Sequence, residues 1–184
     1  VQSAPHLPID VQAIDCDFLL CSAYKFFGPH IGVLWGKYDL MASLPVYKVR
    51  PSKDKPPHRW EIGTGSYETI AAVGSAMSYF AALGQRYRTD YAGSLPEYTG
   101  RRLDMKASMS ALGDYERELA AHLLDELEAY PGAQIYGITD RDRLDELVPT
   151  VVFTLDGHTP DEVATHLAQA QIFKRLGDCS AMNR

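Results

Sequence analysis

The sequence predicts an α/β protein in which short apolar strands alternate with longer helices. Two continuous apolar runs, residues 17–22 ("DFLLCS") and 31–36 ("IGVLWG"), have the length and composition of buried strands. A short Gly-Pro connector joins them, as expected for antiparallel neighbours in a mixed sheet. Residues 66–83 then predict a helix that begins at a capping serine and ends at Gly84. Its small residues would let another backbone approach closely.

The second part of the chain has a pattern of its own. Apolar residues recur at helical spacing until Pro131-Gly132, namely Leu112, Tyr115, Leu119, Leu123, Leu127 and Tyr130. Two strand-like runs follow, "AQIYGI" and "VPTVVFTL". Thr159 then begins a helix in which Glu162 completes a capping box. We therefore expect a first domain over residues 1–111 and a small, truncated α+β domain over residues 112–184.

A long loop is expected between the first strands and the first long helix. Residues 45–65 ("PVYKVRPSKDKPPHRWEIGTG") hold four prolines and many charges. A loop of this length inside a compact domain is usually either functional or disordered. The aromatic Trp60 and the Gly-Thr-Gly end favour a functional loop.

Composition and charge exclude several classes of function. The chain has 184 residues and a formal net charge of -6, which argues against a nucleic acid or an anionic membrane as its main partner. No apolar run approaches the roughly 20 residues that a membrane span requires, and no secretion signal is recognisable. The chain begins "VQSAPHLPIDVQ" without an initiator Met, so we expect it to be a segment of a longer protein.

The cysteines favour a reducing, cytoplasmic setting. Cys16, Cys21 and Cys179 are an odd number without a CxxC pair, which does not fit a disulfide framework. For the same reason we expect no zinc or other metal site. Cys16 and Cys21 flank or lie in the first strand and are expected to be core residues.

Lys25 stands between the two apolar runs and is followed by Gly28 and Pro29. Burial among apolar groups lowers the pKa of a lysine and makes its amine nucleophilic, which is the condition for a Schiff base with a carbonyl compound. The alternative is a structural lysine whose amine reaches the solvent along its aliphatic stem. From the apolar run that ends at Ser22 and the Gly-Pro connector we predict that Lys25 sits at a strand end and faces a cavity, with Ser22 on the same side.

The four residues "SAYK" also match S-x-x-K, the nucleophile motif of β-lactamases and penicillin-binding proteins. That motif requires a helix, with serine and lysine one turn apart. Here Phe-Phe-Gly-Pro follows at once and would break a helix, and the companion motifs S-D-N and K-T-G are absent. We therefore set this reading aside.

The segment "SAYKFFGPHIGVLWG" resembles the active-site segment of class V aminotransferases, in particular their cysteine desulfurase-like branch. "VQSAPHLPIDVQAIDCDF" resembles the family's segment before that strand, and "RWEIGTGSYETIAAVGSAMSYFAALG" resembles its E-x-GT loop and the helix after it. The family binds pyridoxal 5′-phosphate (PLP) on the aspartate-aminotransferase-type fold. The resemblance therefore implies part of that fold's large-domain sheet, followed by a small C-terminal α+β domain.

The resemblance assigns roles to individual residues. Lys25 would form the Schiff base with PLP and later move the proton at the α-carbon of an amino acid substrate. Ser22 and Tyr24 would bind the cofactor phosphate. Gln2 matches the position that contacts the 3-oxygen of the pyridine ring. Thr64 matches the residue that reaches across a dimer to the phosphate of the neighbouring subunit's PLP.

Cys179 is a second catalytic candidate. Cysteine desulfurases carry a nucleophilic cysteine in an R-x-G-x-x-C segment, and "KRLGDCSAMNR" contains Arg175, Gly177 and Cys179. The spacing from arginine to cysteine is one residue shorter than in the family. The alternative is an incidental cysteine near the end of the chain.

The resemblance also places several catalytic groups outside these residues: the Asp that pairs with the ring nitrogen, the ring that stacks on the cofactor and the Arg that clamps the substrate carboxylate. We therefore expect this chain by itself to capture PLP weakly and to show little or no turnover. Two alternatives stay open. One is another PLP reaction, such as that of a lyase, an epimerase or a transaminase. The other is a catalytically silent remnant that acts as a dimerisation or binding module.

We predict a homodimer. By resemblance, Thr64 serves the cofactor of a second copy, and the helix after it is rich in small residues suited to close packing. Light scattering at micromolar concentration should give twice the mass of one chain. A monomer under these conditions would contradict the prediction.

Overall fold

The computed structural model describes residues 3–173. Gln2 and Cys179, both expected at the site, lie outside the described residues. The chain divides into two compact units, Val1–Asp114 and Tyr115–Arg184, and the boundary falls inside the long helix α4 (Gly100–Ala129). Within the described part of the chain, no helix is at once long enough and apolar enough to cross a bilayer.

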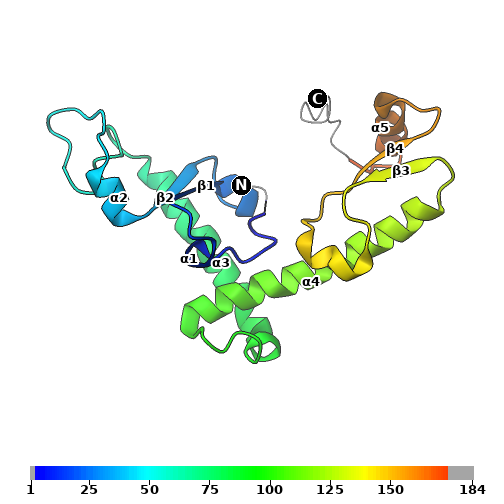
Figure 1. Cartoon of the computed structure of the whole chain (residues 1–184), viewed down its shortest axis with the longest axis horizontal. Coiled ribbons are helices and arrows are strands. Elements are labelled where there is room, and N and C mark those ends of the chain that lie inside the picture. The colour runs from blue at the N-terminus through cyan, green and yellow to red at the C-terminus, as the bar shows by residue number, and fades with distance from the viewer. Residues whose placement is uncertain (1–2, 174–184) are drawn as a thin grey trace. The chain divides into compact units, whose positions relative to one another are not determined.

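The first unit builds a hairpin and several helices before α4 (Figure 1). Residues 44–66 contain no helix or strand, which confirms the predicted loop, whereas the short helix before it was not expected. The elements in chain order are α1 (Val11–Ile14), β1 (Phe18–Ser22), the 3-10 helix η1 (Ala23–Phe26), β2 (Gly32–Gly36), α2 (Tyr38–Ser43) and α3 (Tyr67–Tyr91).

Strands β1 and β2 pair antiparallel, with Leu20 opposite Leu34, which confirms the predicted hairpin. Because side chains alternate along a strand, Leu19 and Cys21 point to the other face from Leu20. The face of Leu19 and Cys21 lines an apolar cavity of about 610 Å³, which also receives Phe80 of α3. On the opposite face Leu20 is 64% exposed and Leu34 is 42% exposed. The expectation of fully buried strands is therefore wrong, because this unit covers only one face of the hairpin.

Helix α3 runs to Tyr91, so the predicted end at Gly84 is wrong. Gly84 is instead the point of closest approach between α3 and α4. A Cβ atom at Gly84 would lie 1.6 Å from the carbonyl oxygen of Asp104, so the crossing requires glycine. Beside it, Arg88 donates from Nε to the buried carboxylate of Asp104 over 2.6 Å. Gly84 therefore does not end α3. It allows α3 and α4 to pack closely at this point.

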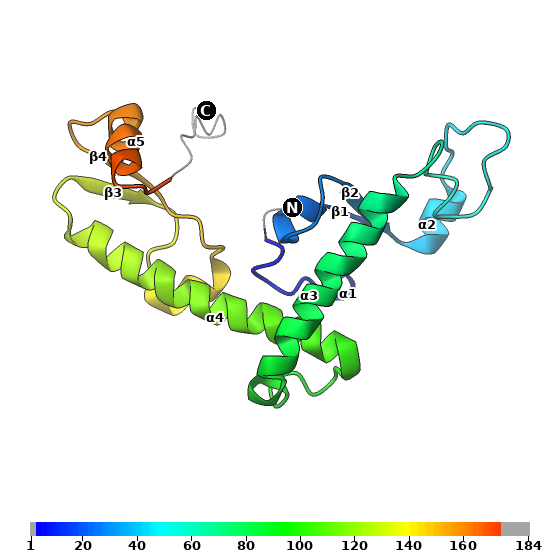
Figure 2. The ribbon, with the colours of Figure 1, turned by 180° about the vertical axis from the view of Figure 1, so that it is seen from behind.

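The second unit continues from α4 into a hairpin and a short helix (Figure 2). Both predicted strands are present, and they pair antiparallel. The capping box is also confirmed, because Thr159 Oγ1 accepts from the Glu162 N–H while the Glu162 carboxylate accepts from the Thr159 N–H. The elements are β3 (Ala133–Tyr136), the 3-10 helix η2 (Arg141–Glu146), β4 (Val152–Leu155) and α5 (Pro160–Gln169).

Arg141 ties η2 to the second half of α4. Its guanidinium binds the carboxylates of Asp125 and Glu128, and their hydrogen bonds raise its pKa above the usual value. Leu124 on α4 and Leu144 on η2 are both buried. The second unit therefore has a small apolar core with an ion-pair cluster beside it.

Gly84→Ala should destabilise the first unit strongly. The added methyl group has no space against the Asp104 backbone, so the two helices must separate. We expect a loss of about 3 kcal/mol in the free energy of unfolding, the upper end for overpacked substitutions. Urea unfolding followed by circular dichroism measures this.

Gly74→Ala is the matched control in the same helix. A Cβ at Gly74 meets nothing within 4 Å, so alanine should be neutral or stabilise by up to about 1 kcal/mol through its helix propensity. Equal effects of the two substitutions would contradict the close crossing.

Candidate functional site

Lys25 lies in η1, the single turn that directly follows β1. The turn is closed by two backbone hydrogen bonds of 2.9 Å, from the Gly28 N–H to the Ala23 carbonyl and from the Ala23 N–H to the Ile31 carbonyl. Ala23 has no exposed surface. The apolar strand and the Gly-Pro connector therefore place Lys25 at a strand end, as the sequence predicts.

Two residues after Lys25 make this turn rigid. A Cβ at Gly28 would lie 2.9 Å from both the Cβ and the carbonyl oxygen of Ala23, so the chain closes most easily with glycine. Phe27 adopts the left-handed region with φ of 62°, which is uncommon for a bulky side chain. Its ring lies 5.8 Å from the ring of Phe80 on α3, measured between centroids. The turn is thus fixed by close contact inside and by an aromatic contact outside.

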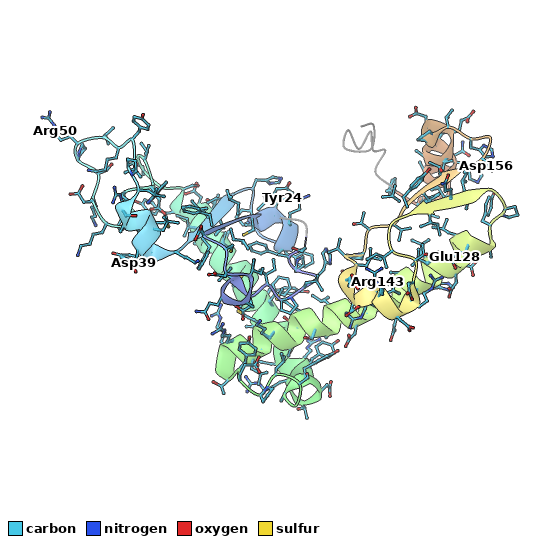
Figure 3. All side chains as sticks on the ribbon, in the orientation of Figure 1. Tyr24, Asp39, Arg50, Glu128, Arg143 and Asp156 are labelled. Atoms are coloured by element: carbon cyan, nitrogen blue, oxygen red, sulfur yellow. The ribbon has the colours of Figure 1, made fainter. Side chains whose placement is uncertain are left out.

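The Lys25 side chain is half-buried, which lies between the two alternatives that the sequence left open. Its Nζ lies 4.8 Å from the centre of the Tyr24 ring, a cation–π contact. The other partner of Tyr24 is His30, whose ring stacks on it with centroids 5.0 Å apart and an angle of 15°. Tyr24 is 46% exposed, and Figure 3 shows it at the surface of η1. Lys25, Tyr24 and His30 therefore form one polar and aromatic cluster.

Ser22 ends β1 and precedes η1, where its side chain makes no capping hydrogen bond. The alternation along β1 puts Ser22 on the face of Leu20, opposite the face of Leu19 that lines the apolar cavity. Neither Ser22 nor Lys25 lines that cavity. The expectation of a lysine facing a cavity together with Ser22 is thus not met by this cavity, which lies on the other face of the hairpin.

Thr64 lies in the exposed arm that leads from the long loop into α3. Gly63 before it has a φ of 80°, a left-handed conformation that suits glycine. In residues 3–173, no hydrogen bond joins Thr64 to Ser22, Tyr24 or Lys25. The structure therefore brings Ser22, Tyr24 and Lys25 together on one turn and leaves Thr64 outside that cluster.

The arm of Thr64 is fastened to the end of α2. Arg59 donates from Nη1 to the Ala42 carbonyl and from Nη2 to the Leu44 carbonyl, the second over 2.9 Å. Trp60 donates from Nε1 to the Met41 carbonyl over 3.0 Å. We had assigned no role to Arg59. The only feature of the sequence that could have indicated a role for Arg59 is its position directly before Trp60 and the E-x-GT pattern.

The outer part of the loop and the far end of the hairpin carry ion pairs of their own. A hydrogen bond from Lys48 lowers the pKa of the Asp54 carboxyl, with Nζ and Oδ1 2.9 Å apart. Lys37, just after β2, binds Asp15 and Asp17, and these hydrogen bonds raise the pKa of the lysine. The carboxylates of both clusters are exposed, and neither cluster includes Lys25.

Cys16 and Cys21 are free thiols and half-buried. Cys21 lines the apolar cavity, in keeping with a packing role. Across the residues that the structure describes, no group of three or more His, Cys, Asp or Glu side chains is arranged to hold a metal ion.

Comparison with known proteins places this turn in a family. The family model described as Aminotransferase class-V matches residues 1–114, which include β1, the lysine turn and the Thr64 arm. The chain belongs to the class-V aminotransferase family. Members of this family depend on PLP, and the relatives below confirm the resemblance to its cysteine desulfurase-like branch.

The similar proteins are cysteine desulfurases. The chain is 30% identical to one from Cronobacter sakazakii, over 98% of this chain and 40% of that protein. Those from Serratia proteamaculans and Shigella flexneri are each 28% identical over the same shares. The solved structure of the cysteine desulfurase CsdA from Escherichia coli has a similar fold, with a TM-score of 0.67 at 24% identity over 95% of this chain and 39% of that chain. This class-V chain thus spans about 40% of the length of the curated relatives it matches.

Gly28→Ala should loosen the lysine turn. The added Cβ would press on Ala23 at 2.9 Å, so the backbone must shift where η1 closes. We expect a loss of about 1–3 kcal/mol in the free energy of unfolding, measured by urea titration.

Gly32→Ala serves as the control at the start of β2. A Cβ at Gly32 meets nothing within 4 Å, so this substitution should change stability by less than about 0.5 kcal/mol. A larger effect at Gly32 than at Gly28 would overturn this account of the turn.

Proposed function

We propose that this chain forms the PLP-binding part of a cysteine desulfurase-like enzyme that acts on an amino acid through Lys25. The observation that supports the proposal most is the fixed turn η1, which directly follows Ser22 and holds the Lys25 amine over the ring of Tyr24. An amine reacts with an aldehyde, and hydroxyl groups donate hydrogen bonds to phosphate oxygens. The side chains at this turn therefore suit the aldehyde and the phosphate group of PLP.

Each residue has a distinct part in the proposal. Lys25 would hold the cofactor through its amine, which suits the aldehyde. Ser22 and Tyr24 would bind the phosphate from the same subunit, and Thr64 would bind it from a second copy. Gln2 would contact the 3-oxygen of the ring, and Cys179 would be the nucleophile toward the substrate sulfur, whose bond to carbon would break. Both lie outside the described residues, so their roles rest on the family pattern alone.

When bound, PLP stabilises negative charge at the α-carbon of an amino acid. The Lys25 amine would take and return the proton at that carbon. The stacked rings of Tyr24 and His30 hold the Tyr24 hydroxyl in place while this happens. The proposal also includes a cytoplasmic homodimer in which residues 112–184 form the small C-terminal domain.

A second candidate is a catalytically silent binding or dimerisation module. Leu20 and Leu34 expose a continuous apolar pair on one face of the hairpin, which favours burial against another polypeptide. In this case Lys25 would carry no cofactor.

The decisive experiment is to incubate the chain with PLP and reduce it with borohydride. We expect a visible absorbance band that borohydride abolishes, and peptide mass spectrometry should place the reduced adduct on Lys25. Lys25→Ala should lose the adduct, whereas Lys53→Ala, an exposed lysine of the long loop, should keep it. An adduct spread over many lysines, or none at all, would contradict the proposal and favour the silent module.

Sulfide release from cysteine then separates a desulfurase from other PLP reactions. Loss of sulfide release in Cys179→Ser would support Cys179 as the nucleophile. Release of another product from a panel of amino acids would assign a different reaction to the same cofactor.

A further inference from the structure

Two side chains of the long loop, residues 44–66, fasten it to the C-terminal end of α2, where helix carbonyls lack partners within the helix. Arg59 and Trp60 occupy it through the carbonyls of Met41, Ala42 and Leu44. All of these bonds are partly buried, so they are shielded from competition by water.

Arg59 and Trp60, with the α2 carbonyls that they bind, form an anchor for the loop. This anchor also contacts the hairpin that leads to Lys25. The ring of Trp60 lies 6.4 Å from the ring of Phe18 at the start of β1, measured between centroids. Met41 is buried and packs beneath Gly36 at the end of β2, where a Cβ would come within 2.7 Å of its sulfur. The anchor therefore transmits the position of the hairpin to the loop.

The arm beyond the anchor is short and has few contacts of its own. Thr64 follows Trp60 by four residues, so it lies within about 14 Å of it even if the arm is fully extended. No hydrogen bond of residues 62–65 occurs among the described residues. The next fixed point is Ser66, whose carbonyl accepts from the Ile70 N–H in the first turn of α3.

We infer that Arg59 and Trp60 are positioning residues for Thr64, and that they set how strongly the site prefers a phosphorylated cofactor. This inference rests on the proposed function. Arg59 suits the task because its planar guanidinium bonds two carbonyls at once and lysine lacks that fork. Its buried Nε has no hydrogen-bond partner among the described residues, so the side chain gains its polar contacts at the α2 carbonyls alone.

The test compares PLP with pyridoxal, which has the same aldehyde and no phosphate. Thr64→Ala and Arg59→Ala should each weaken PLP binding about tenfold, as expected for a lost hydrogen bond to a charged group, and leave pyridoxal binding unchanged. The double variant should lose no more than either single variant, because Arg59 acts through Thr64. A general loss of stability would weaken both ligands equally.

Two milder variants and one control sharpen the comparison. Trp60→Phe keeps an aromatic ring beside Phe18 and removes the hydrogen bond from Nε1. Arg59→Lys keeps the charge and removes the planar guanidinium that bonds two carbonyls at once. Both variants should lose part of the preference for PLP over pyridoxal. Arg50→Ala is the control, because Arg50 lies at the outer tip of the same loop and points away from the fold (Figure 3). It should keep the full preference for PLP.

A second readout needs no cofactor. Hydrogen–deuterium exchange of residues 59–61, whose N–H groups donate to the carbonyls of Lys55, Pro57 and His58, should speed up in Arg59→Ala and stay unchanged in Arg50→Ala. An unchanged exchange rate, or an unchanged preference for PLP over pyridoxal in Arg59→Ala, would overturn the inference. If the parent chain forms no adduct on Lys25, the proposed function fails, and the role of Thr64 in phosphate binding fails with it. Faster exchange in Arg59→Ala would still establish Arg59 as the anchor of the arm.

Discussion

The closure of the chain between Ala23 and Gly28 is the constraint on which the candidate site depends. One backbone hydrogen bond closes the turn from Gly28 to Ala23, a second ties Ala23 to Ile31 just before β2, and Ala23 is fully buried. The left-handed backbone of Phe27 is costly for an aromatic residue, and the contact of its ring with Phe80 offsets part of that cost. The position of Lys25 therefore follows from the backbone of its turn, and its own side chain remains half-buried and able to react.

The same contacts connect the turn to the helices. Phe80 lies on α3 one turn before Gly84, and Gly84 is where α3 touches α4 at Asp104. Any movement of α4 at this crossing shifts α3, and α3 shifts the aromatic support of the lysine turn. Stability of the helix crossing and geometry of the site are thus coupled through a few contacts, although the crossing contributes no reactive group.

Local patterns in the sequence predicted the elements that local interactions determine. The hairpin, the long loop and the capping box at Thr159 all depend on residues close in the chain. The true end of α3 could not be predicted, because the sequence does not distinguish a glycine that ends a helix from one, such as Gly84, that allows two helices to pack closely. The burial of Lys25 could not be decided from the sequence, because it depends on segments that are distant in the chain. Arg59 was missed because bonds from a side chain to a helix end leave no periodic pattern.

The proposed phosphate-binding residues are attached to opposite ends of the hairpin. Lys25 follows Ser22 at one end of β1, whereas the anchor of the Thr64 arm contacts Phe18 at the other end, and Figures 1 and 2 both show η1 and α2 at opposite ends of the strands. Phe18 and Ser22 are about 13 Å apart at about 3.3 Å per residue. The arm is at most about 14 Å long when straight, and the left-handed Gly63 bends it. The bent arm is therefore shorter than the straight length needed to follow β1 from Phe18 to Ser22, which favours the proposal that Thr64 serves the Lys25 of a second copy.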